Sequence, residues 1–233
     1  MKRSEINAIL RESRQFFQRM QFKLPPWAAW GPDDWQGRAD EAREIVDAML
    51  GWDLTDFGSG AFRDTGLVLF TLRNGLPERT GKTYAEKIMI VGENQVTPMH
   101  FHWHKMEDII NRGGGNLVLE LFGATEDEKL SHRPVEVSVD GIRREVEPGG
   151  TVVLTPGESI CLTPRLYHRF YGEPGKGTVL VGEVSMVNDD TADNRFYDPV
   201  GRFPAIEEDE PPEHLLVNDY GQHVHPPGSG LDN

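Results

Sequence analysis

The feature that most constrains the fold is a series of short β-forming segments that fills the middle of the chain. These segments are separated by glycine, proline and aspartate, and they lie at residues 66–72, 85–91, 117–122, 135–139, 151–154, 159–163 and 178–187. Strands and helices do not alternate along this region as they do in βαβ units. The pattern therefore predicts a mainly β fold with antiparallel strands, arranged as a barrel or a sandwich.

One turn in this region has a specific signature. Asp140-Gly141 separates residues 135–139 from residues 142–146. An Asp-Gly pair between two β-forming runs is typical of a two-residue hairpin, because both turn positions need a positive φ. We therefore predict a hairpin here.

The chain before the β region is expected to be helical. Apolar residues recur at helical spacing from Ile6 to Met20, Ser4 is in position to cap this helix, and Pro25 follows its end. A second helix is predicted over residues 39–50. Between the two helices, three indoles are expected to pack in an ordered loop: Trp27, Trp30 and Trp35.

Length and charge limit the organisation and the partners. At 233 residues, one domain is expected, with a helical extension at 1–53 packed on a barrel at 54–203, and a C-terminal tail at 204–233. The formal charge of −14, without a basic run, argues against a nucleic-acid partner. A single cysteine, Cys161, rules out an internal disulfide. No signal-like or membrane-spanning apolar stretch is present, so we predict a cytoplasmic protein without a membrane partner.

Three closely spaced histidines indicate the chemistry. His100, His102 and His104 are two residues apart, and residues at this spacing in a strand face the same side, so all three could point into a barrel. Buried imidazoles on one face are costly unless a metal ion binds them. A further ligand must come from a strand distant in sequence, and His168 is the best candidate. The other histidines are expected at the surface: His132, His214, His223 and His225.

The spacing of these residues resembles the first sequence motif of cupins. In His100-x-His102, Glu107 follows after four residues and Gly114 after six more. In cupins the two histidines and the glutamate of this motif bind a metal ion. The resemblance implies a cupin fold, which is a double-stranded β-helix or jelly-roll barrel, here with N-terminal helices.

A later stretch resembles the second cupin motif, which supplies the last histidine ligand. It contains Gly150, Pro156-Gly157 and then His168. It departs from the usual motif because eleven residues separate Pro156 from His168 and Gly172 replaces the terminal asparagine. The two motifs together imply that one ion is bound by His100, His102, Glu107 and His168.

The wider sequence resembles the bacterial D-lyxose isomerase family of cupins. The segments that carry this likeness are EKIMIV at 86–91, QVTPMHFHWHKME at 95–107, GEVS at 182–185, NDD at 188–190 and NRF at 194–196, and the likeness extends from the first helix to about Phe203. The family implies interconversion of D-lyxose and D-xylulose, and often of D-mannose and D-fructose, by a homodimer. It also implies Mn²⁺ as the preferred ion, with Co²⁺, Fe²⁺ and Zn²⁺ compatible with the same ligands.

Isomerisation of a sugar needs a proton-transfer group beside the ion. Lys87 and Glu183 interrupt apolar strands, where an inward charge is costly without a function or a partner. We expect Glu183 to be the base and Lys87 to be the acid or to neutralise oxygen charge, unless each faces solvent. Asp190 and Arg195 could orient sugar hydroxyls or form a loop salt bridge. His104 is expected to contact the substrate or to support the metal ligands.

Two other functions fit the same ligand set. A cupin dioxygenase with non-haem iron also uses two or three histidines and a glutamate. A metal-stabilised binding protein without turnover is the second alternative. An isomerase needs charged and hydroxyl-binding side chains near the ion, whereas a dioxygenase needs an open position for O₂, so the polar groups of the pocket separate the two enzymes.

Overall fold

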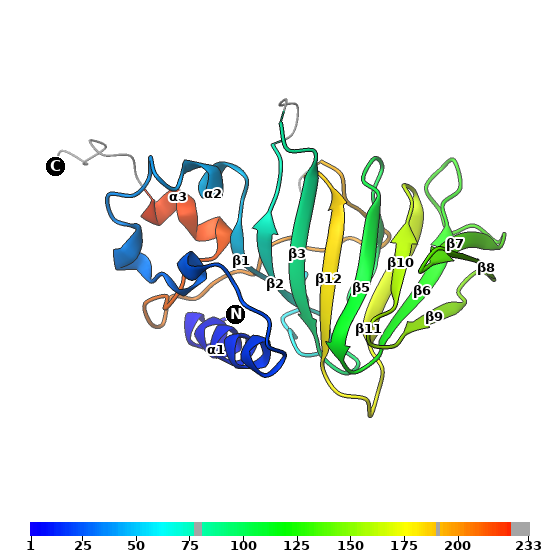
Figure 1. Cartoon of the computed structure of the whole chain (residues 1–233), viewed down its shortest axis with the longest axis horizontal. Coiled ribbons are helices and arrows are strands. Elements are labelled where there is room, and N and C mark those ends of the chain that lie inside the picture. The colour runs from blue at the N-terminus through cyan, green and yellow to red at the C-terminus, as the bar shows by residue number, and fades with distance from the viewer. Residues whose placement is uncertain (77–80, 190–191, 225–233) are drawn as a thin grey trace.

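Two antiparallel sheets form most of the protein, as a computed structural model that describes residues 1–76, 81–189 and 192–224 shows (Figure 1). The larger sheet has eight strands in the order β1 (Gly51–Thr55), β2 (Leu67–Arg73), β3 (Tyr84–Val91), β12 (Val179–Met186), β5 (Glu107–Gly114), β10 (Ser159–Leu162), β7 (Val135–Val139) and β8 (Ile142–Val146). The smaller sheet has five, in the order β13 (Arg195–Phe196), β4 (Thr97–Phe101), β11 (Leu166–Gly172), β6 (Leu117–Gly123) and β9 (Thr151–Leu154). The prediction of a mainly β, antiparallel fold is confirmed.

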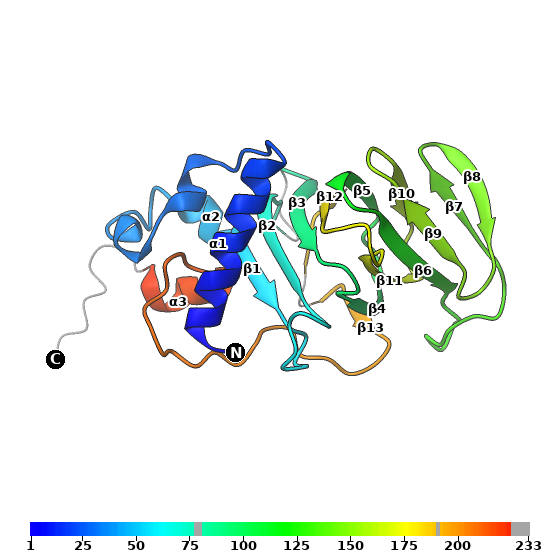
Figure 2. The ribbon, with the colours of Figure 1, turned by 90° about the horizontal axis from the view of Figure 1, so that it is seen from below.

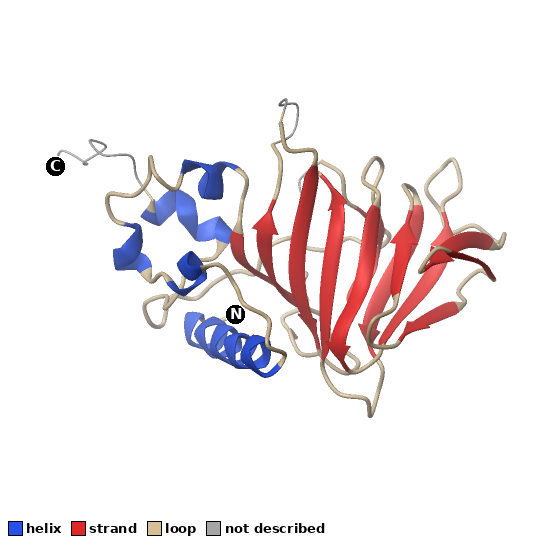
Figure 3. Cartoon of the chain, viewed as in Figure 1, coloured by secondary structure: helices blue, strands red, loops and turns tan. Residues whose placement is uncertain are grey.

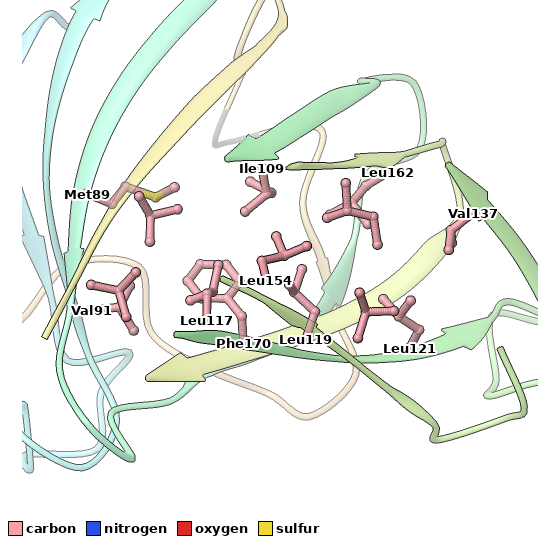
Figure 4. Close-up of a cluster of buried hydrophobic side chains, with 14 of the residues drawn as sticks. Met89, Val91, Ile109, Leu117, Leu119, Leu121, Val137, Leu154, Leu162 and Phe170 are labelled. Carbon is pink, nitrogen blue, oxygen red and sulfur yellow. The ribbon is translucent and has the colours of Figure 1, made fainter. Parts of the chain in front are cut away.

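The main core lies between the two sheets (Figure 4). Met89 and Ile109 project into it from the larger sheet, and Leu119 and Phe170 from the smaller one. Each is at most 3% exposed. Removing this much apolar surface from water is the main stabilising contribution to such a fold. The two sheets are thereby held as the walls of one barrel.

The strand pairing agrees with most of the expected runs. The Asp140-Gly141 turn joins β7 and β8, and both residues have the positive φ that the hairpin requires, 49° and 80°. Among the described strands, five do not appear among the expected runs, namely β1, β4, β5, β11 and β13, although the histidine spacing was interpreted on the assumption of a strand where β4 lies. Of these, β1 is fully buried and pairs with β2.

The helices gather at one end of the molecule (Figure 3). The first, α1 (Arg3–Arg19), lies beside β1 and β2 (Figure 2) and buries Ile6 and Leu10 against the outer face of the larger sheet. It begins before the expected cap, and Ser4 instead donates hydrogen bonds to Asp209. The helix expected at 39–50 is shorter and consists of α2 (Arg43–Asp47). The remaining helical turns are η1 (Pro26–Ala29), η2 (Pro32–Trp35), η3 (Val217–Asp219) and α3 (Tyr220–His223).

The tryptophan loop is ordered by ring packing, as expected. Trp35 is 3% exposed, and the rings of Trp27, Trp30 and Tyr220 surround it.

Among the described residues, no helix combines the length and the apolar character of a membrane span.

Residues 205–224 pack against the first helix and the tryptophan loop. Leu216 is fully buried, and Arg3 of α1 donates two hydrogen bonds to the carboxylate of Asp219 at 2.9 Å. His214 was expected at the surface but is 6% exposed, with Nδ1 donating to the carbonyl of Trp30. The first helix and the C-terminal segment therefore stabilise each other, while residues 225–233 lie outside the described part.

Candidate metal centre and active site

Three buried histidines come together where β4 and β11 pair. His100 and His168 are directly opposite in register, and His102 follows the end of β4 by one residue. The ligand atoms of the three rings lie within 4.8 Å of one another. The structure thus brings the expected histidine from the distant strand to the pair from the first motif.

Backbone carbonyls fix the orientation of all three rings. Nδ1 of His100 donates to the Pro98 carbonyl at 2.7 Å, and Nδ1 of His168 donates to Leu166 at 3.0 Å. Nδ1 of His102 donates to the Asp193 carbonyl at 2.9 Å. A neutral imidazole that donates through Nδ1 carries a lone pair on Nε2, which is the state that binds a metal. Burial and the nearby rings hold the pKa of His100 well below its ordinary value, which favours this neutral state.

A carboxylate faces these lone pairs. Oε1 of Glu107 lies 3.4 Å from Nε2 of His102 and 3.2 Å from Nε2 of His168. Nε2 of His168 is buried and has no hydrogen-bond partner among the described residues. Burial alone would raise the pKa of Glu107, but Lys105 and His102 hold it well below its ordinary value, so the side chain is a carboxylate. The lone pairs on Nε2 of the histidines and the carboxylate of Glu107 repel each other unless a cation lies between them. These residues therefore fit a divalent ion.

Lys105 is a site residue that the sequence analysis missed. Its Nζ lies 2.8 Å from Oε2 of Glu107 and 3.0 Å from Oε1 of Glu183, and its side chain is 3% exposed. The sequence did contain a signal for it. Glu107 is five residues after His102, so in one continuous strand the two side chains would point to opposite faces, and both can reach one ion only if the strand breaks between them. Lys105 is two residues before Glu107 and therefore points to the same side as Glu107.

Lys87 and Glu183 form the neighbouring part of the site. They are paired in register on β3 and β12, both face the interior, and Nζ of Lys87 lies 3.3 Å from Oε1 of Glu183. The solvent-facing alternative is therefore wrong for both. Burial alone would raise the pKa of Glu183, but the ammonium groups of Lys105 and Lys87 lower it overall. Oδ1 of Asn188 accepts hydrogen bonds from both lysines, at 2.7 Å from Lys87 and 3.1 Å from Lys105.

Two of the other expected substrate contacts, His104 and Arg195, do not line the cavity described below. Strand β4 ends at Phe101, so the expectation that His104 points into the barrel is wrong, and this residue is exposed. Nε of Arg195 donates to Glu128 at 2.9 Å, which agrees with the loop salt bridge rather than with a place in the cavity. Asp190 lies outside the described residues.

A cavity opens beside the three histidines and combines two kinds of wall. Charged groups line one part: Lys87, Lys105, Glu107, Glu183 and Arg202. Apolar groups line another: Phe57, Leu67, Leu69, Met89, Phe170 and Phe196. This combination suits a small ligand that carries both hydroxyl groups and C–H surface.

The sequence matches one family over most of its length. The family profile described as D-lyxose isomerase matches residues 1–220. A protein of Serratia proteamaculans named D-lyxose/D-mannose isomerase is 53% identical over 223 residues, which cover 94% of this chain and 98% of that protein. A protein of Escherichia coli O157:H7 with the same name is 52% identical and covers 95% of this chain and 99% of its own length.

The fold matches solved structures of L-ribose isomerases. The L-ribose isomerase of Cellulomonas parahominis, solved with L-ribose, superposes with a TM-score of 0.61 at 18% identity, covering 89% of this chain and 98% of that chain. The L-ribose isomerase of Geodermatophilus obscurus gives 0.58 at 18% identity with the same coverage. The jelly-roll expectation is therefore confirmed, and on the sequence matches this chain belongs to the D-lyxose isomerase family.

Proposed function

We propose that this protein is an aldose–ketose isomerase that interconverts D-lyxose and D-xylulose, and also D-mannose and D-fructose. The observation that carries the proposal is the buried array of Lys87, Lys105 and Glu183 beside the three histidines. The reaction requires a proton-transfer group and stabilisation of negative charge on the sugar oxygens, and a carboxylate and two ammonium groups beside a metal-binding set can supply both. The names of the relatives agree with this activity.

We propose that His100, His102, Glu107 and His168 bind one divalent cation. When bound, such an ion supplies Lewis-acid stabilisation of the negative charge that develops on the sugar oxygens. Three imidazole nitrogens and one carboxylate, without thiolate, suit Mn²⁺, which is our proposal for the resident ion, and also Co²⁺, Fe²⁺ and Zn²⁺. Metal analysis of protein purified without added salts tests this assignment.

The proton route is proposed to run through Glu183. Among the described residues, Lys105 and Ser185 donate hydrogen bonds to Oε1 of its carboxylate. We therefore propose that Oε2 takes the proton from C2 of the aldose and returns it to C1. Nζ of Lys105 and Nζ of Lys87 then stabilise negative charge on the enediolate oxygens of the sugar. His104 and Arg195 have no part in this proposal, because neither lines the cavity.

The decisive experiment is anaerobic incubation of the chelated and the Mn²⁺-reloaded protein with a panel of aldoses, followed by measurement of ketose. The reloaded protein should form D-xylulose from D-lyxose without O₂, and the chelated protein should not. Turnover that stops without O₂ would contradict the isomerase and favour a cupin dioxygenase. Failure of every sugar to exchange its C2 proton with solvent would favour a binding protein.

A homodimer is the proposed assembly. An exposed apolar patch on the outer face of the larger sheet supports it: Tyr84, Met106, Val184 and Met186 are 41–52% exposed, and Met186 pairs in register with Tyr84. Exposed apolar patches of this kind mark interaction surfaces. Light scattering should give twice the mass of one chain, and Met186→Glu should give a monomer. A wild-type protein that is monomeric at micromolar concentration would contradict the proposal.

A further inference from the structure

Buried polar side chains continue across the larger sheet beyond the proposed proton-transfer groups. The row runs from Glu107 on β5 through Glu183 on β12, Lys87 on β3 and Thr71 on β2 to Asp53 on β1. Lys87 is opposite Glu183 on one side and opposite Thr71 on the other, whereas Glu107 and Asp53 at the two ends are each offset by two residues along their strands. Buried polar groups are costly unless they have partners. The charged groups of the row have partners in ion pairs, and a ligand with several hydroxyl groups along the row would add hydrogen bonds to these.

Arg202 closes the far end of the row. It comes from the segment after β13, and its Nη2 lies 2.5 Å from Oδ2 of Asp53. Its side chain is 24% exposed, whereas that of Asp53 is 4% exposed. Arg202 lines the cavity of the histidines and also an adjoining cavity that Asp53, Thr71 and Asn188 line. The guanidinium group therefore stands between the proposed reaction centre and a second polar space.

Asp53 carries an unused acceptor at this position. Its Oδ1 is buried and has no hydrogen-bond partner among the described residues. Arg202 offers several N–H donors in a planar group, and the free oxygen of Asp53 offers an acceptor. A sugar hydroxyl is both donor and acceptor, so it matches this pair.

The charges of the cavity wall favour a neutral ligand. Among the described wall residues, Lys105 is paired with Glu107 and Glu183, Lys87 with Glu183, and Arg202 with Asp53. A phosphate group would have to compete with these carboxylates for the cations. Hydroxyl groups can instead share the same cations without adding charge.

We propose that Arg202, held by Asp53, binds hydroxyl groups of the sugar that are remote from C1 and C2, and so selects free sugars of suitable length over sugar phosphates. This inference rests on the proposed isomerase function. It makes Arg202 a specificity-determining residue that takes no part in proton transfer.

The test compares Arg202→Gln with Arg202→Lys on D-lyxose, 4-deoxy-D-lyxose and 5-deoxy-D-lyxose in the Mn²⁺-loaded protein. Loss of a hydrogen bond from a charged donor should lower kcat/KM on D-lyxose by roughly 10- to 100-fold for Gln, and less for Lys. On the deoxy sugar that lacks the contacted hydroxyl the loss should be no more than about 3-fold, because that contact is already missing. Arg73→Gln is the matched control, since it breaks an ion pair with Glu86 at 2.9 Å on the outer face of the same sheet and should leave all rates unchanged.

Thermal unfolding and metal content, measured for each variant, separate binding from folding. An equal loss on all three sugars, or no loss on any, would overturn the proposal, and Arg202→Lys decides the matter if Arg202→Gln does not fold. Wild-type preference for D-mannose 6-phosphate over D-mannose would overturn the assignment to free sugars. If the wild-type protein isomerises no sugar, the proposed function itself fails. If the wild-type protein is active but the Arg202 variants behave like Arg73→Gln, only the inference about Arg202 fails.

Discussion

Replacing Glu183 by glutamine should separate catalysis from stability. The side chain is buried, accepts from Nζ of Lys105 at 3.0 Å and lies 3.3 Å from Nζ of Lys87. In the variant, Lys105 retains its ion pair with Glu107 at 2.8 Å. Both lysines also retain their hydrogen bonds to Oδ1 of Asn188. The free energy of unfolding should therefore fall by only about 1–3 kcal/mol, less than the roughly 3–5 kcal/mol that a fully broken buried ion pair costs.

Turnover should respond far more strongly, because glutamine cannot accept the C2 proton. Loss of a general base lowers kcat by roughly 100-fold or more, equivalent to about 2.7 kcal/mol or more in the barrier. The assay measures kcat on D-lyxose in D₂O, deuterium in the ketose by NMR, and bound Mn²⁺, which should not change. Near wild-type turnover of Glu183→Gln, together with complete retention of deuterium from C2-deuterated lyxose, would refute the proton route and leave Glu183 a structural role.

Three further predictions concern the metal, the helical end and the pH dependence. His168→Ala should lose bound Mn²⁺ in metal analysis, whereas His104→Ala should retain it, and the reverse result would contradict the proposed ligand set. Arg3→Met should lower the free energy of unfolding in urea by about 3–5 kcal/mol, because it leaves the buried carboxylate of Asp219 without its 2.9 Å partner. Burial lowers the pKa of His214 from its ordinary 6.5, so the folded state favours the neutral ring. The contribution of this residue to stability should be complete above about pH 6.5 and decrease as the pH falls from there toward the lowered pKa. Urea titrations across this range should show a smaller decrease in His214→Gln, and an identical decrease in both proteins would contradict the assignment.

Most strands that could be predicted have mainly apolar inner residues, and β3 and β12 were predicted although each carries one inward charge, Lys87 and Glu183. Strand β5 was missed because its inward positions include Glu107 and Asn111, which hide the alternation of a half-buried strand. The start of α1 was misplaced for a different reason. Ser4 bonds to Asp209, a contact across 205 positions of sequence that no local pattern can indicate.

The candidate site was predictable where the sequence resembles the cupin motifs. That resemblance indicated His100, His102 and His168, and the structure brings these three rings together. The alternation argument failed at His104, because the chain leaves the strand after Phe101. Lys105 and Arg202 reach the cavity through a strand break and a returning segment, and both are tertiary features without a motif.

The bonds between α1 and the C-terminal segment have a consequence for synthesis. Arg3 is made 216 positions before Asp219, the buried carboxylate that holds it. At a translation rate of about 5–20 residues per second, roughly ten to forty seconds pass between the synthesis of Arg3 and that of its partner. Arg202, too, is made after every strand of both sheets. A nascent chain truncated before residue 202 would therefore lack one residue of the cavity wall and the buried carboxylate that binds Arg3, so both features form only after residues 202–219 have been made.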